Sequence, residues 1–469
     1  MTDSPDSPTP VPGNTRVRYS ILLLLCTLAM ITYVDRAVIG SSKADIMGAV
    51  GRSPADFFYL LTAFQLAYAL FEIPSGWMGD TFGPRKTLLR IVLWWTTFIG
   101  LTALAGYTIP GTEMIFLGFY GLILVQFLFG MGEAGAFPNI SKALYNWFPL
   151  AQRGFAQGAV WMSARLMGGL TPMIWLLMTD PDIGGLSWRQ GLGVLALVAL
   201  AWCAIFLWWF RNEPGEHRAV SDREADLIAA NRRPTVGHSG VPWKRIFTSR
   251  NMWCICGMYF CLNFGWYFFM YFLPGFFKEN FGTAGDSIGD KLGLAMLAGA
   301  PLLLGMPGCL VGGILSDRWV RNTGDRKWGR RVYGMIGFFM CSVCYFVAVL
   351  SIKDLWVFAV FIGMAGFFND LTMGSCWATC QDVGRKYAAV VSGFMNMIGN
   401  LGAALTNFVT GTIIASYTTK IAIEGSDKFR FEVDPLGYQT CLMMYVVAYF
   451  VGTFFWLGID ASKPIVTED

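Results

Sequence analysis

The chain has 469 residues, of which 55% are apolar and only 14% are charged, and its formal net charge is +4. Soluble domains carry roughly 25% charged residues, so this composition excludes a water-soluble enzyme, a nucleic-acid-binding protein and a secreted module stapled by disulfides. Apolar runs of about 20 residues recur along nearly the whole chain, and each is long enough to cross a bilayer. The composition therefore predicts an all-α membrane protein.

Twelve transmembrane helices are predicted, and one long hydrophilic segment separates the sixth from the seventh. Residues 1–15 are rich in Pro, Ser and Thr and are expected to form a disordered N-terminal tail. The predicted spans are residues 18–42, 56–79, 86–107, 113–140, 152–178, 188–210, 251–277, 291–315, 331–350, 355–380, 388–415 and 436–458. The domains expected from these spans are a six-helix bundle at 16–211, a cytoplasmic loop at 212–250, a second six-helix bundle at 251–460 and a cytoplasmic tail at 461–469.

The basic residues are distributed unevenly between the two sides of these spans. If the N-terminus is cytoplasmic, the inner segments carry 24 of the 35 Lys and Arg residues and the outer segments carry nine. Cytoplasmic loops of membrane proteins are enriched in Lys and Arg. We therefore expect both termini in the cytoplasm and the chain in the inner membrane.

The cysteines and histidines do not indicate a metal site. All eleven cysteines lie in or beside apolar runs, without His or carboxylate neighbours at the spacing of metal ligands. Buried reduced thiols behave as small apolar side chains. Because no nucleotide-binding loop, metal cluster or catalytic triad is visible, we expect no cofactor and no chemistry on a bound substrate.

A glycine-rich charged motif stands in the same loop of each predicted bundle. Between spans two and three the sequence is GWMGDTFGPRK, and a looser copy lies between spans eight and nine. Glycine permits close helix approach and tight turns, and an acid beside two bases is able to hold helix ends together and release them. The expected conformational-switch residues are Gly76, Asp80, Gly83, Arg85, Lys86, Asp317 and Arg318.

This repeated motif and the twelve-span layout resemble the signature of the major facilitator superfamily. Segments such as YVDR from Tyr33 in span one and GMGEAGAFPN from Gly130 in span four further resemble the anion:cation symporter family within it. Its members include bacterial permeases for galactonate, hexuronates, glucarate and aromatic acids, and the animal vesicular glutamate and sialic acid carriers. The resemblance implies two six-helix bundles. It also implies proton-coupling roles for Asp35 and Glu133, and substrate contacts from Tyr33, Arg36 and Tyr68.

The charged residues inside the spans indicate the same chemistry. Asp35, Arg36, Glu133 and Arg165 all fall within predicted spans of the first half. A charge near the bilayer centre costs roughly 2.5–3.5 kcal/mol, so it persists where it faces protein or a wet cavity. An arginine can bind a carboxylate through two parallel hydrogen bonds, and protonation of a neighbouring acid would free that arginine for an anion. Asp35 and Arg36 could instead form a structural ion pair.

One pair of positions departs from the family pattern. Many members carry an arginine seven residues before the span-four glutamate, where this chain has Gln126. Conversely, Arg165 stands in span five where many bacterial members have glutamine. We hypothesise that Arg165 replaces the missing arginine, either as the partner of Glu133 or as a second contact for the anion.

Further candidates come from polar and aromatic groups on the predicted helix faces. Asn396 and Asn400 are four residues apart and share a face, where they would contact substrate hydroxyls or join two helices. The full set of expected substrate-binding residues is Tyr33, Arg36, Tyr68, Gln126, Arg165, Tyr267, Ser375, Trp377, Asn396 and Asn400.

Three other features of the predicted spans bear on the site. Glu72 is expected to join the charge cluster around Arg85 rather than the substrate site. Asp370 is an ambiguous charge in the second half. The aromatic series of span seven is expected mostly to pack or to face lipid, with Tyr267 or Tyr271 as a gate of the cavity.

Together these observations predict a monomeric secondary active transporter that carries a small organic anion with protons by alternating access. A sugar acid such as a hexonate or hexuronate is the first expectation, because the polar ring supplies partners for hydroxyls. Aromatic and dicarboxylic acids come next. The alternatives are an anion exchanger or uniporter without proton coupling, for example of phosphate esters, and a transporter-like ligand sensor. Span seven has no Lys or Arg before Lys278, which argues against phosphate esters, and the 212–250 loop is too short for a sensor's output domain.

Overall fold

The computed structural model describes residues 15–52, 57–108, 115–179, 184–229, 241–273, 276–277, 288–422 and 429–465. The predicted N-terminal tail therefore lies outside the described residues except for Thr15, and so do the last four residues of the predicted C-terminal tail.

Long helices make up most of the described chain. The first half contains α1 (Val17–Ser41), α2 (Lys43–Ala49), α3 (Phe57–Phe82), α4 (Pro84–Thr102), α5 (Phe119–Glu133), α6 (Ala136–Trp147), α7 (Arg153–Thr179) and α8 (Trp188–Trp209). Two short helices, α9 (Asp222–Ala229) and α10 (Trp243–Thr248), follow in the connecting segment. The second half contains α11 (Arg250–Tyr271), α13 (Ile288–Thr323), α14 (Arg326–Leu350), α15 (Leu355–Leu371), α16 (Met373–Gly384), α17 (Ala388–Ser416) and α18 (Pro435–Gly458).

These helices match the twelve predicted spans in order, with spans four and ten each broken into two helices, α5–α6 and α15–α16. By length and composition, eight segments of the described residues qualify as membrane spans, and one of them, 355–414, holds two predicted spans. Helices α3, α4 and α7 are not among the eight, and they carry the charged residues Glu72, Arg90 and Arg165.

A small β-hairpin was not predicted. Strands β1 (Thr418–Ala422) and β2 (Phe429–Val433) pair antiparallel between α17 and α18, with Thr418 opposite Val433. Both strands are rich in β-branched and aromatic residues, which favour strands.

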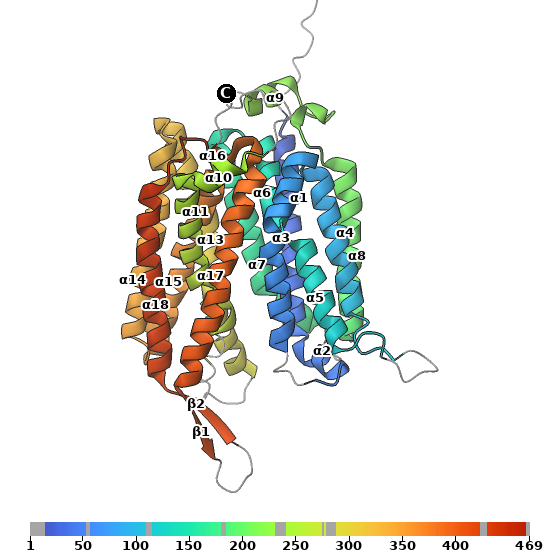
Figure 1. Cartoon of the computed structure of the whole chain (residues 1–469), viewed down its shortest axis with the longest axis vertical. Helices are drawn as coiled ribbons and strands as arrows, with labels where there is room; N and C mark the ends of the chain where they lie inside the picture. The colour runs from blue at the N-terminus through green and yellow to red at the C-terminus, as the bar shows by residue number, and fades with distance from the viewer. Residues whose placement is uncertain are drawn as a thin grey trace, which may run out of the picture.

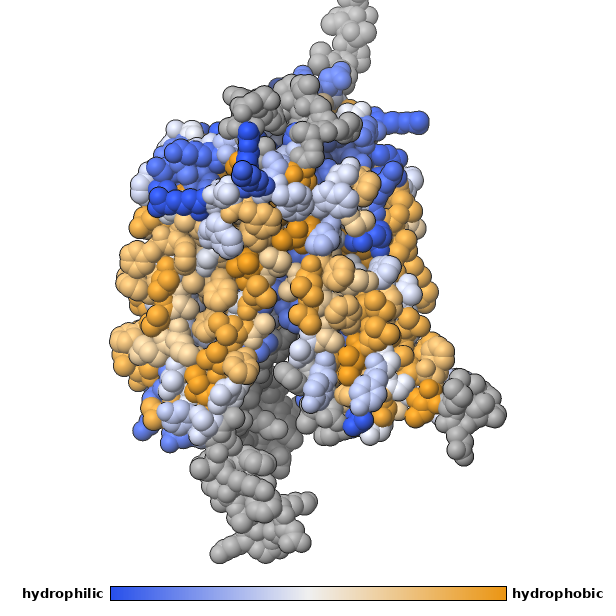
Figure 2. Space-filling model, viewed as in Figure 1, coloured by the Kyte–Doolittle hydropathy of each residue, from blue (hydrophilic) through white to orange (hydrophobic). Residues whose placement is uncertain are grey.

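The outside of the molecule matches a bilayer. Large apolar side chains are exposed on many helices, among them Leu23, Trp208 and Phe408, which are 65%, 72% and 73% exposed. Figure 2 shows an apolar band around the middle of the visible face and hydrophilic residues toward the ends. In water such a surface would be unfavourable, whereas in hydrocarbon it is not.

One end of the molecule collects both described chain ends and the connecting segment. Thr15 donates a hydrogen bond to Glu224 of α9 at 2.7 Å, and Asn251 donates one to the backbone carbonyl of Asp460 at 2.9 Å. We call this the loop end. The opposite end carries the β1–β2 hairpin and is called the hairpin end (Figure 1). Helices α1–α8 gather on one side of the molecule and most of α11–α18 on the other (Figure 1), and we call these the first and second halves.

Two aspartates join the halves at the loop end in a symmetrical way. Asp80 of α3 accepts hydrogen bonds from two backbone N–H groups in the first turn of α17, at 3.3 and 2.8 Å. Asp317 of α13 accepts two from the first turn of α7, at 3.0 and 2.6 Å. The first N–H groups of a helix lack partners within it and carry partial positive charge, so a carboxylate there is stabilising. Each half thus caps a helix of the other.

The basic partners of these aspartates differ from those expected. Asp80 pairs with Lys142 at 3.5 Å, whereas the Arg85 guanidinium donates to the Leu207 carbonyl at the end of α8 and Lys86 is exposed. The expected cluster of Asp80 with Arg85 and Lys86 does not form, because the first turn of α4 faces α8 and solvent rather than α3.

In the second-half motif, too, the aspartate pairs with a base other than the expected one. Arg318 is exposed, and Asp317 pairs instead with Arg330 at 2.7 Å. Arg330 also contacts Asp382, which pairs across the halves with Arg153 at 2.9 Å. The loop end is therefore closed by a network of buried charges.

At two positions of the first motif the backbone requires glycine. At Gly76, α3 lies against the Ala389 carbonyl of α17 so closely that a Cβ atom would collide with it. Gly83 has φ of +85°, a conformation that side chains disfavour, and it starts α4 directly after α3.

The contacts that join the two halves at the loop end predict that D317N opens this end. The Asp317–Arg330 pair lies within the second half, so only the contact of the carboxylate with the first turn of α7 is specific to the closed arrangement. Such a contact contributes up to about 2 kcal/mol, and D317N weakens it by removing the negative charge. Spin labels at the exposed positions 86 and 318, in a background with the native cysteines replaced, should report a longer distance in a fraction roughly tenfold larger than in the parent protein. Asp325, which caps α14 within the second half, supplies the matched control D325N. Equal distance distributions for D317N and D325N would contradict the assignment.

Candidate functional site

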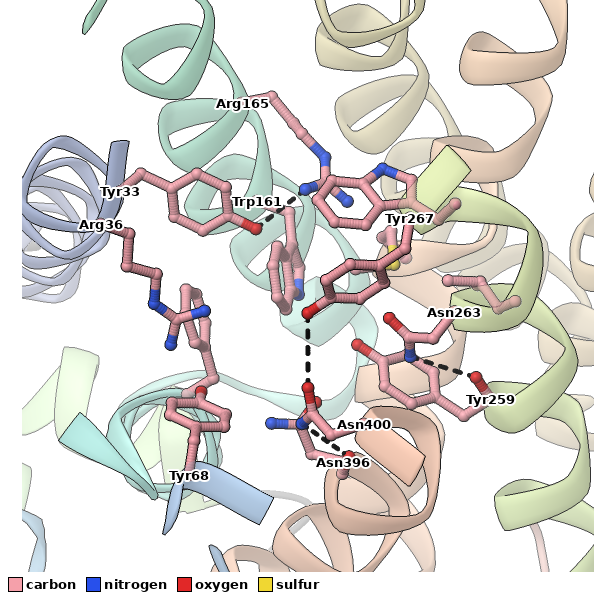
Figure 3. Close-up of a pocket in the computed structure, with 14 residues that line it drawn as sticks. Tyr33, Arg36, Tyr68, Trp161, Arg165, Tyr259, Asn263, Tyr267, Asn396 and Asn400 are labelled. Carbon is pink, nitrogen blue, oxygen red and sulfur yellow. Dashed lines mark hydrogen bonds between the residues drawn. The ribbon is translucent and has the colours of Figure 1, made fainter. Parts of the chain in front are cut away.

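A pocket lies between the two halves, and both halves line it. Figure 3 shows its polar groups pointing toward one another from α1, α3 and α7 on one side and from α11 and α17 on the other. The lining residues are Tyr33, Arg36, Tyr68, Phe137, Trp161 and Arg165 from the first half, and Tyr259, Leu262, Asn263, Trp266, Tyr267, Met373, Asn396 and Asn400 from the second. Seven of the ten residues expected to bind substrate are among them.

The guanidinium of Arg36 is only partly hydrogen-bonded. Arg36 donates from Nε to Glu133 Oε1 at 2.6 Å and lies over the Tyr68 ring, 4.4 Å from its centroid. Its Nη2 is buried and has no hydrogen-bond partner among the described residues. A buried donor without a partner is costly, so this atom is suited to bind an incoming anion.

The second guanidinium is fully engaged. Arg165 donates to both carboxylate oxygens of Asp370, at 2.7 and 3.0 Å, and to the Tyr33 hydroxyl at 2.8 Å. Its guanidinium carbon lies 4.2 Å from the Trp266 ring centroid. The alternative in which Arg165 pairs with Glu133 is therefore wrong for this conformation, because Glu133 pairs with Arg36.

The two carboxylates occupy corresponding places in the two halves. Glu133 is the last residue of α5, and the left-handed Gly135 (φ +82°) starts α6. Asp370 lies in the last turn of α15, directly before the break at Thr372. Interrupted helices place polar groups at the middle of transporters. Both breaks bring an acid to a pocket arginine.

The loop side of the pocket is closed by packed aromatic rings. Phe137 and Trp161 stack with centroids 4.3 Å apart, and Trp161 contacts Trp377 at 5.4 Å. Trp377 is completely buried and donates from its indole to the Tyr259 hydroxyl at 3.3 Å. Trp377 therefore supports the pocket from beneath rather than lining it.

Amides bridge the halves beside this aromatic layer. Asn400 accepts a hydrogen bond from Gln65 of α3 at 2.8 Å and a weaker one from the Tyr267 hydroxyl at 3.4 Å. Asn396 donates to Glu72 of α3 at 2.5 Å. The expectation that Glu72 joins the charge cluster around Arg85 is therefore wrong. Glu72 contacts the pocket residue Asn396 instead.

Three other expected residues do not line the pocket. Gln126 is buried and donates to Thr102 at 3.2 Å. Ser375 is buried, and its hydroxyl has no partner in the described part of the chain. Asp35 is 2% exposed, neither carboxylate oxygen is hydrogen-bonded among the described residues, and it faces Trp95 and Glu133. It lies behind the pocket, next to the Arg36–Glu133 pair.

Several lining residues were not singled out from sequence. Trp161 precedes Arg165 by four residues and so shares its helix face, which was a usable signal. Trp266 and Asn263 were hidden within the apolar and aromatic series of α11, which was expected mostly to pack or to face lipid. Asp370 carried no local signal for its partner.

The sequence itself matches a family model. The model of the Major Facilitator Superfamily matches residues 25–407. The chain belongs to this superfamily. A member of it is a membrane transporter and not an enzyme, and the predicted twelve-helix fold is confirmed.

Curated relatives are transporters of small anions. The chain is 30% identical to a probable sulfoacetate transporter of Cupriavidus necator, over 88% of this chain and 91% of the relative. It is also 30% identical to a probable galactarate/D-glucarate transporter of Pseudomonas putida (86% and 87% covered) and 24% identical to a hexuronate transporter of Bacillus subtilis (85% and 90%). The resemblance to permeases of the galactonate and hexuronate type is thereby confirmed.

Solved structures share the fold at low identity. A bacterial homologue of the iron transporter ferroportin in its outward-facing state superposes with a TM-score of 0.68 at 11% identity, covering 94% of this chain and 99% of that one. The human organic anion transporter MFSD10 gives 0.65 at 13%, covering 94% and 100%. These likenesses establish the superfamily fold alone.

The geometry predicts that R165Q reduces uptake to background in this transporter. The change leaves Asp370 buried without its cation, which costs about 3–5 kcal/mol, and it removes a guanidinium from the pocket. Uptake by proteoliposomes, with insertion checked by size-exclusion chromatography, measures the effect.

The double variant R165Q/D370N separates the two causes. It removes both charges, so thermal stability should recover, while uptake should stay lost if the guanidinium contacts the anion. Near-normal uptake by R165Q, or recovery of uptake in the double variant, would show that Arg165 is structural only.

Proposed function

We propose that this chain carries a small organic anion together with protons across the inner membrane, by alternating access and as a monomer. The loop end, where the basic residues gather, is the cytoplasmic end, so that both termini are cytoplasmic. The two six-helix bundles are the bodies that move, and the segment 212–250 connects them.

One observation carries the proposal. Two guanidiniums, Arg36 and Arg165, reach a single pocket between the halves, and each is paired with a buried carboxylate. A charge-assisted, bidentate contact is the strong way for arginine to hold a carboxylate or sulfonate. An anion entering the pocket can therefore take the place of Glu133 or Asp370 on its arginine.

Proton coupling follows from the same exchange. If Glu133 takes a proton, its attraction for Arg36 weakens, and the guanidinium becomes available to the substrate. Release of the anion restores the pair only when Glu133 is ionised again. Asp35, buried beside Glu133 without a hydrogen-bond partner in the described residues, is the second proton site in this scheme.

The pocket favours a hydroxylated acid. Tyr68, Tyr267, Asn396 and Asn400 present hydroxyl and amide groups around the two arginines. Such groups pair with sugar hydroxyls, whereas an unsubstituted apolar anion would leave them unpaired. The relatives named for glucarate and hexuronate support a sugar acid, and the one named for sulfoacetate supports a small sulfonate as the second candidate.

The coupling scheme predicts that uptake acidifies the lumen of proteoliposomes and that E133Q abolishes this. Glutamine imitates the protonated acid and leaves Arg36 free, so E133Q should still exchange labelled for unlabelled anion but lose accumulation driven by a pH gradient. A luminal pH dye and labelled anion measure both. D354N, at an exposed cap of α15, is the control and should behave like wild type. Wild-type uptake without proton movement would favour the exchanger or uniporter instead.

The pocket also predicts which ligands stabilise the purified protein. A bound ligand at 100 times its Kd stabilises by about 2.7 kcal/mol. Glucarate and a hexuronate should raise the unfolding temperature more than sulfoacetate does, and the uncharged hexose should leave it unchanged because it cannot pair with Arg36. Equal stabilisation by the uncharged hexose would argue against an anion site.

A further inference from the structure

A third carboxylate lies at the pocket and belongs to neither arginine pair. Glu72 of α3 is completely buried, and its Oε1 accepts a hydrogen bond from Asn396 Nδ2 of α17 at 2.5 Å. Asn396 itself lines the pocket. Because α3 runs toward the loop end, Glu72 lies on the loop side of Tyr68, at the point where the pocket ends and the closed interface begins.

Glu72 has no cation of its own. No ion pair among the described residues includes it, and its Oε2 has no hydrogen-bond partner there, although the Tyr68 side chain, four residues earlier on α3, interacts with it. The titratable and charged groups that act on it are Tyr68 on its own helix, Arg36 of α1 and Glu133 of α5. Arg36 is already bound to Glu133, so it cannot fully neutralise a second acid. An ionised carboxylate buried in this way is far more costly than the neutral carboxylic acid.

The contacts of α17 that bury Glu72 exist only while the loop end is closed. Gly393 of α17 lies directly against the Glu72 backbone, and further toward the loop end Asp80 binds the first turn of the same helix. Alternating access requires α3 and α17 to part at this end. Glu72 then loses Asn396 and meets water on the loop side.

We propose that Glu72 is a proton-carrying residue at the interface between the two halves. With the loop end closed, the side chain is a carboxylic acid held against Asn396. When the loop end opens, the O–H bond breaks, the proton passes to water on the loop side and the carboxylate remains. On closing without a proton, the carboxylate would be buried again, so closure awaits a new proton. The inference rests on the proposed proton-coupled function and adds to it a third acid that links protonation to closure.

The test follows the conformation and needs no substrate. Spin labels at positions 86 and 318 report the fraction of molecules open at the loop end in lipid nanodiscs, across a pH series. One proton released on opening raises the open-to-closed ratio up to tenfold per pH unit, by linkage. In E72Q, which keeps an acceptor for Asn396 but cannot titrate, the slope should fall by the contribution of one proton. An unchanged slope overturns the proposal.

Two further variants complete the design. Gln65 makes the neighbouring cross-half hydrogen bond to Asn400 without a titratable group, so Q65N should change the open fraction at every pH but keep the wild-type slope. If E72Q does not insert, N396L removes the donor to Glu72 and should move the midpoint of the pH series. A midpoint equal to that of wild type then overturns the proposal.

Failure of this inference is distinguishable from failure of the proposed function. A wild-type protein that moves anion without protons, while E72Q still lowers the slope, contradicts the symport mechanism and leaves Glu72 a titrating residue. A wild-type protein that acidifies the lumen, with the same slope in E72Q, leaves symport intact and removes Glu72 from it.

Discussion

A guanidinium buried in a membrane protein must be neutralised, and the two pocket arginines are neutralised differently. Arg36 and Glu133 belong to the same half, so their pair can move as part of one body. Arg165 and Asp370 belong to opposite halves, so any relative rotation at the pocket strains that bidentate contact. The charges of the site are thus linked to the geometry of the whole molecule, because an unpaired buried charge is far more costly than a broken surface contact.

The loop end uses contacts that are strong in sum but individually reversible. A carboxylate at a helix N-terminus contributes up to about 2 kcal/mol in a partly buried site. Asp80 and Asp317 each make such a contact across the halves. Opening exchanges these helix N–H groups for water, which can bond to both the N–H and the carboxylate. A closure built in this way can be stable and still be reversed by binding energy at the pocket.

The fold alone does not explain the chemistry of the pocket. Solved structures with only 11–13% identity share the superfamily fold, and one fold can carry different substrates. The specific features lie in the lining. Gln126 is engaged with Thr102 outside the pocket, and Arg165, on α7 in the next predicted span, brings the second guanidinium to the pocket. Trp266 of the second half packs against that guanidinium, so both halves shape the same anion site.

The sequence by itself determined the number and order of the long spans, the concentration of basic residues at one end, and most of the pocket. These follow from local properties, since a span needs about 20 apolar residues and a charge within one must face protein or water. Only the tertiary structure decided the partners. Arg165 bonds to Asp370, which is 205 positions away along the chain, and no local pattern specifies such a contact. Glu72 was assigned to the cluster around Arg85 because it lies close to Pro74 and to the inner end of the span, yet the ten residues of α3 from Glu72 to Phe82 span about 15 Å. That distance separates the pocket from the loop end, and packing of α3 against α17 placed Glu72 at the pocket.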